Sequence, residues 1–192
     1  MYTGAAMVPD EPDLTDAVRW VEALRAAYVR SLEDGTACWR RAEGAAAAGP
    51  VPAKALAKAA LLALETMGPG DSISLGMSAC EALRRHGGAG ELERLRAVRA
   101  TLPARSGLRD WRAEATRARV VIEARAAGSC TCAAEAACGA GVYDEQWRVE
   151  SERVDREQYC VHMVVRCTRC QSAWLVRQDD GYHYPTFAWS RA

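Results

Sequence analysis

Two cysteine pairs are the feature that most limits how the last third of this 192-residue chain can fold. The first is Cys130-Thr131-Cys132 and the second is Cys167-Thr168-Arg169-Cys170. Between them, residues 159–166 alternate in polarity with a period of two, which predicts a half-buried strand. Pairs that flank two strands can meet at one end of a sheet, where four thiolates form the tetrahedral sulfur set that Zn²⁺ prefers. We therefore predict a structural zinc ion bound by Cys130, Cys132, Cys167 and Cys170.

Further strands are expected within residues 147–154, at residues 174–176 and at residues 187–189. Together they predict a small antiparallel sheet of three or four strands in residues 128–192. A unit of this size rarely folds on its hydrophobic core alone. Structural zinc supplies an apparent binding energy of about 10–16 kcal/mol in zinc-finger peptides, which would offset that deficit.

The C-terminal unit resembles a zinc ribbon, because Cys167-x-x-Cys170 lies at a turn between two expected strands and a second cysteine pair lies upstream. The resemblance implies a structural Zn²⁺ as the cofactor. The chain departs from the ribbon pattern in two ways. The first pair is C-x-C, and Gln171 stands after Cys170, where ribbons often have glycine for its positive φ.

Other roles for cysteines remain open in the sequence. Cys138 or Cys160 could replace one of the four ligands, and Cys160 and His162 share a strand face on which both could coordinate a metal. Cys138 follows an alanine-rich stretch that predicts a helical turn, so both cysteines also fit packing roles. A thioredoxin-like dithiol at Cys167 and Cys170 would need a helix after the motif, whereas a strand is expected there.

Residues 1–127 have helical rather than strand periodicity. Apolar residues from Leu14 to Leu32 recur every three or four positions, and Asp34-Gly35 is expected to end that helix. Breaks at residues 49–52, 68–70, 87–88 and 103 divide the remainder into further helices. Residues 53–127 resemble HEAT-like helical hairpins in helix length and spacing, and an irregular all-α bundle is the alternative. The predicted fold class is α+β, with a helical module at 1–127 and a β unit at 128–192.

Charge and hydropathy exclude several classes of protein. Lys+Arg and Asp+Glu both number 25, so the formal net charge is zero, which disfavours a general nucleic-acid coat or a polybasic membrane binder. No stretch of 18 uncharged apolar residues predicts a transmembrane helix, and the first 16 residues do not have the pattern of a signal peptide. We therefore expect a cytoplasmic protein without a membrane partner.

Catalytic motifs for phosphate binding, nucleophilic hydrolysis or dinucleotide binding are absent from the sequence. Four close cysteines would also fill the coordination shell of a zinc ion, so we expect a binding protein and not an enzyme. A zinc-ribbon regulator that binds nucleic acid is the alternative. Residues 128–192 contain nine acidic and seven basic residues, a balance that does not favour phosphate contacts.

Candidate partner-binding residues are aromatic or basic, because tyrosine, tryptophan and arginine dominate interface hot spots. They are Tyr182, Tyr184 and Trp189 in the C-terminal tail and Arg94 and Arg109 in the helical module. In size, class and lack of catalytic motifs, the chain resembles small bacterial immunity and antitoxin proteins. That resemblance implies a protein partner, such as a toxin whose active site is occluded.

Overall fold

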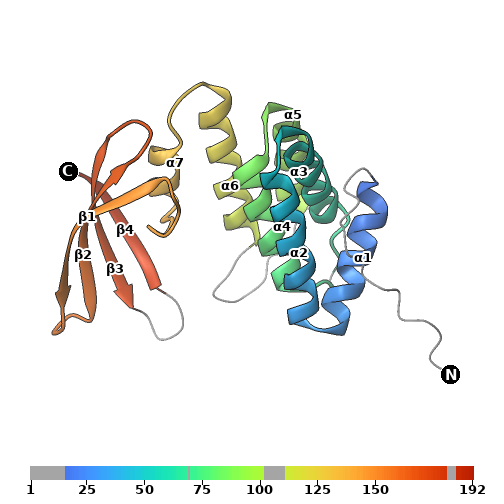
Figure 1. Cartoon of the computed structure of the whole chain (residues 1–192), viewed down its shortest axis with the longest axis horizontal. Helices are drawn as coiled ribbons and strands as arrows, with labels where there is room; N and C mark the ends of the chain where they lie inside the picture. Colours follow the sequence, from blue (N-terminus) through green and yellow to red (C-terminus); the bar gives the residue numbers. More distant parts are fainter. Residues whose placement is uncertain (1–15, 69, 102–110, 181–184) are drawn as a thin grey trace. The chain divides into compact units, whose positions relative to one another are not determined.

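The computed structural model describes residues 16–68, 70–101, 111–180 and 185–192 (Figure 1). The fold is mixed α+β, and the chain divides into two compact units, Met1–Ala126 and Ala127–Ala192. The first unit is helical and the second contains a four-stranded antiparallel sheet. Among the described residues, no helix combines the length and the apolar character that a membrane crossing requires.

Six helices are described in the first unit, and their ends lie at capping residues or at helix-breaking residues. Asp16 caps the first helix by accepting a hydrogen bond from the Arg19 amide, and Ser72 caps the fourth in the same way through the amide of Ser74. The helices are α1 (Ala17–Arg30), α2 (Leu32–Ala47), α3 (Pro50–Glu65), α4 (Ile73–His86), α5 (Ala89–Thr101) and α6 (Trp111–Ala126).

The expected end of the first helix at Asp34-Gly35 is wrong. Helix α1 is capped at its C-terminal end by Ser31, whose backbone is extended. The Ser31 hydroxyl accepts a hydrogen bond from the Asp34 amide, so Ser31 is also the N-cap of α2. Gly35 therefore lies inside α2. A Cβ at that position would lie 2.2 Å from the Tyr28 ring, so the glycine permits close packing of α1 on α2 and does not terminate a helix.

Helices that are one or two places apart in the sequence pack on one another. Neighbours α1–α2, α2–α3, α3–α4 and α5–α6 are in contact, as are the alternate pairs α1–α3, α2–α4, α3–α5 and α4–α6. Their shared core is rich in alanine and leucine, with the indoles of Trp20 and Trp39 in contact at 5.2 Å. The alanines allow the helices to approach closely along α3, which contacts four other helices.

The second unit is a four-stranded meander preceded by the short helix α7 (Cys132–Ala137). Each strand pairs with the next in the sequence, in the order β1-β2-β3-β4 (Figure 1). One face of the sheet carries the core, which includes two buried indoles, two of the cysteines and aliphatic side chains of β2 and β3, with a third indole packed against it. The strands are β1 (Trp147–Asp155), β2 (Cys160–Cys167), β3 (Ala173–Asp180) and β4 (Pro185–Arg191).

Candidate metal centre

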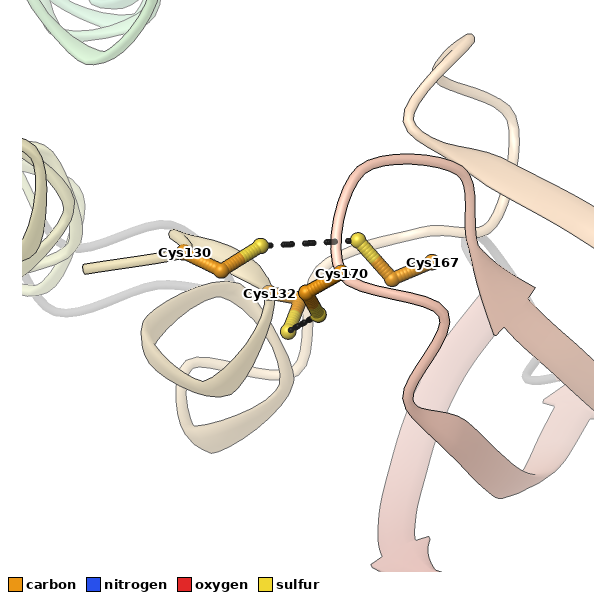
Figure 2. Close-up of side chains that lie close together, drawn as sticks. All are labelled: Cys130, Cys132, Cys167 and Cys170. Atoms are coloured by element: carbon orange, nitrogen blue, oxygen red, sulfur yellow. Dashed lines mark hydrogen bonds between the residues drawn. The ribbon is translucent and has the colours of Figure 1, made fainter.

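Two chain segments bring the predicted cysteine ligands together. Cys130 and Cys132 lie at the start of α7, and Cys167 and Cys170 lie at the turn between β2 and β3. Figure 2 shows the two segments facing each other with the four sulfurs between them. The structure therefore brings together the four cysteines that the sequence pairs indicated, although they are up to 40 positions apart.

The sulfur atoms have the spacing of a tetrahedral metal site. The distance from Cys130 Sγ to Cys167 Sγ is 3.5 Å and that from Cys132 Sγ to Cys170 Sγ is 3.4 Å, and all four sulfurs lie within 4.8 Å of one another. A zinc–sulfur bond of about 2.3 Å in a tetrahedron places its sulfurs about 3.8 Å apart. A disulfide needs about 2.05 Å, and all eight cysteines are free thiols. The four thiols could hold a metal ion.

Burial divides the four thiols into different electrostatic environments. Burial raises the pKa of the Cys132 and Cys130 thiols, with hydrogen bonds between the thiols contributing. Hydrogen bonding with the side chain and backbone of Ser172 lowers the pKa of Cys170 to about 6. The lowered pKa of Cys170 favours its thiolate form, which is the form that binds a metal ion.

Gln146 connects the two cysteine segments, and no motif in the sequence indicates this role. Its side-chain oxygen accepts a 2.7 Å hydrogen bond from the Thr131 hydroxyl, between Cys130 and Cys132. Its backbone oxygen accepts a 2.8 Å hydrogen bond from the amide of Thr168, next to Cys167. One residue just before β1 thus fixes both segments, as groups outside the ligand shell commonly do in metal sites.

The turn that carries Cys170 has a positive φ at the residue after that cysteine, although this residue is a glutamine and not a glycine. Gln171 itself adopts the left-handed conformation, with φ of 62°. Its amide donates to the Cys167 carbonyl at 3.0 Å, and its side-chain amide donates to the Thr168 carbonyl at 3.0 Å. These bonds offset the strain that a non-glycine residue meets in this conformation.

The other cysteines lie outside this group. Cys138 forms the C-cap of α7, and Cys38 and Cys80 are buried in the helical core. Burial raises the pKa of both helical thiols, so they remain protonated and inert. Cys160 lies at the opposite end of β2 from Cys167, where its Sγ is 3.4 Å from His162 Nε2.

The predicted partner-binding residues do not form one group. Trp189 packs on the indoles of Trp147 and Trp174, with ring centroids 4.5 and 6.1 Å away, and donates a 2.8 Å hydrogen bond to the Ala140 carbonyl. Its first role is therefore in the core of the sheet unit. Arg94 is half exposed and forms a bidentate ion pair with Glu65. Tyr182, Tyr184 and Arg109 lie outside the described residues.

Comparisons with protein-family models, with curated proteins and with solved structures find no match to this chain.

Proposed function

We propose that this protein is a non-catalytic, cytoplasmic protein-binding module whose C-terminal unit is held together by a structural Zn²⁺. The observation that carries the proposal is the group of four sulfurs within 4.8 Å of one another, contributed by two segments of one unit. Four protein ligands complete the tetrahedral shell of zinc and leave no position for a substrate, which is typical of structural sites. The eight free thiols fit a reducing compartment.

Zinc fits this ligand set better than the other common metal ions. Calcium and magnesium prefer oxygen ligands, whereas four thiolates in a tetrahedron select zinc or iron. Two of the four ligands, Cys132 and Cys167, are themselves part of the small hydrophobic core beside the indoles. A metal at their sulfurs would therefore link α7 directly to the sheet.

The helical unit is the proposed binding element. Each of its helices packs on helices that are one or two places away in the sequence, as in stacked helical hairpins, which supports the HEAT-like interpretation. Such stacks present long faces to protein partners, and a toxin occluded by an immunity-type protein is one such partner. Arg94, which projects from α5 with half of its side chain exposed, is the described residue that we place in the contact.

The ion pairs of the helical unit favour a protein partner over nucleic acid. Arg84 and Arg85 pair with Glu81, Arg94 pairs with Glu65, and Arg96 pairs with Glu123. Phosphate binding depends on cationic side chains that exchange counterions for phosphates, and each of these arginines already has a carboxylate partner.

Elemental analysis tests the zinc proposal. We expect Cys167→Ser to lose about one zinc equivalent per chain relative to the wild type purified without added zinc. Cys80→Ser is the matched control, because Cys80 is equally buried but lies in the helical core. Equal zinc in the wild type and Cys167→Ser would refute the proposal.

Reconstitution tests the binding role. A partner recovered with the tagged chain, after nuclease treatment, should form a 1:1 complex when both proteins are purified. Arg94→Ala should weaken the complex, whereas Arg40→Ala on the exposed side of α2 should not. Binding that survives only with nucleic acid present and falls steeply with salt would instead support the nucleic-acid alternative.

A further inference from the structure

A second group of metal-ligating side chains lies at the end of the sheet opposite the four cysteines. It consists of Asp155 at the end of β1 and of Cys160 and His162 on β2. One ligand atom of each lies within 4.8 Å of the others, and Cys160 Sγ is 3.4 Å from His162 Nε2. The three residues offer a carboxylate, a thiol and an imidazole, which are the three side-chain types that bind zinc.

The register of the first hairpin explains why the three side chains meet. Asp155 pairs directly with Cys160 across the two strands, so both side chains lie on one face of the sheet. His162 is two residues further along β2 and shares that face. The face is opposite to the one on which Met163 and Val165 join the hydrophobic core.

The carboxylate is held in place by the turn. Asp155 Oδ1 accepts hydrogen bonds from the backbone amides of Glu157 and Gln158, at 3.1 and 3.0 Å. The next residues of the turn lead to Tyr159, whose positive φ of 50° turns the chain into β2. The position of one candidate ligand is thus fixed before any ion binds, which lowers the cost of ordering it.

The spacing of the two best-placed atoms fits a common metal ion. With a metal–sulfur bond of about 2.3 Å and a metal–nitrogen bond of about 2.0–2.1 Å, a tetrahedral ion separates sulfur from nitrogen by about 3.6 Å. The separation of 3.4 Å in the structure is close to that value. Three protein ligands would leave one coordination position for water or a small anion.

We propose that Asp155, Cys160 and His162 form a second site, independent of the four-cysteine centre, for a divalent ion of the zinc and cobalt type with one exchangeable ligand. The site does not depend on the proposed binding role of the helical unit. It also differs in kind from the four-cysteine centre, because its shell is open.

The surroundings of the site support an ion and provide a path to it. Arg177 pairs with His162 across β2 and β3 and is held by Asp179, with Nη2 and Oδ1 2.7 Å apart. His162, Arg153 and Arg177 line a cavity of about 650 Å³ on this face, through which an ion and its exchangeable ligand can enter.

Burial argues for a ligand role of Cys160 and against a reactive Cys-His pair. Cys160 is 1% exposed, whereas a nucleophilic thiol must be reached by its substrate. A buried thiol whose sulfur, together with an imidazole and a carboxylate, lies within 4.8 Å of the other two ligand atoms instead fits the ligand set of a metal ion.

Cobalt titration of the full-length, metal-depleted chain tests the proposal. Co²⁺ gives thiolate charge-transfer and d–d absorption bands that count bound ions and report their geometry. The variants are His162→Gln and Asp155→Asn, of which the second keeps an oxygen that can accept the turn hydrogen bonds. His86→Gln in the helical unit is the control, and circular dichroism checks that each variant is folded.

We expect His162→Gln and Asp155→Asn each to bind one Co²⁺ equivalent fewer than the wild type and the control. Azide should shift the d–d bands of the ion that these variants lose, because that ion has an open position. A single ion lost in Cys167→Ser but retained in both variants would overturn the second site. Unchanged stoichiometry in folded His162→Gln would do the same, as would rapid alkylation of Cys160 in the presence of Co²⁺, which would favour the reactive pair.

Discussion

Changing the free zinc concentration should move the unfolding transition of only one of the two units. The sheet unit has a described core of nine buried residues, two of which are the ligands Cys132 and Cys167, whereas the helical unit has 27. Zinc that binds the folded sheet unit stabilises it in proportion to the logarithm of free zinc over the dissociation constant. The helical core contains none of the four ligands and should not respond.

The size of the effect follows from that linkage. Free zinc at 100 times the dissociation constant contributes about 2.7 kcal/mol. A domain of this size shifts its midpoint by about 4–8 °C per kcal/mol, so the transition of the sheet unit should rise by roughly 10–20 °C relative to a chelated sample.

Differential scanning calorimetry in zinc-buffered and chelated samples measures this shift. Near-UV circular dichroism reports the indole pairs of both units, because the ring centroids of Trp147 and Trp189 lie 4.5 Å apart in the sheet unit and those of Trp20 and Trp39 lie 5.2 Å apart in the helical unit. The near-UV transition that does not coincide with the loss of the helices belongs to the sheet unit. Far-UV circular dichroism follows the helices. An identical midpoint of the indole signal in chelator and in zinc would refute the reasoning, as would an equal shift of both transitions.

Three further results are expected. Gln146→Ala should weaken zinc binding by about 10–100-fold in a chelator competition, because it removes the bond to Thr131, whereas Gln158→Ala should not. Burial raises the pKa of two of the centre's thiols, so these thiols are protonated at neutral pH and zinc binding should release their protons. The affinity for zinc should therefore fall as the pH falls, and calorimetry in two buffers would measure the released protons. In urea unfolding, Gly44→Ala should stabilise the helical unit by about 0.8–1 kcal/mol, because the new methyl group lies in open space on a helix. Gly35→Ala should destabilise the unit by about 1–3 kcal/mol, because the new methyl group clashes with the Tyr28 ring.

The parts of the fold that depend on local pattern could be predicted from the sequence. The alternation around Met163 and Val165 indicated β2, because side chains of a strand alternate between faces whatever the partner strand is. The two cysteine pairs indicated that they lie together in the fold, because four thiolates form the ligand set that zinc prefers. The α+β class, with helices before the sheet, follows from the same patterns and is confirmed.

Features that depend on distant contacts could not be predicted. Asp34-Gly35 has residue types that are typical of a helix end. Gly35 lies inside α2 because the ring of Tyr28, from the neighbouring helix, leaves no room for a side chain there. Gln146 has no motif, since its role comes from hydrogen bonds to two segments that lie far from each other in the sequence. The strand expected at residues 174–176 extends to Asp180 in the structure, because the ladder between β3 and β4 continues through Asp179 and Asp180.

The meander order of the sheet has a consequence for how the unit folds. Each strand pairs with its sequence neighbour, so the hairpin that carries Cys167 and Cys170 closes over a short stretch of chain and can form early. Cys130 and Cys132 must arrive from more than 30 residues upstream, at a greater entropic cost. Half of the metal centre would therefore exist before the other half, and an ion captured by the hairpin would recruit the segment around α7. The availability of the metal would then control the last step of folding and not the first.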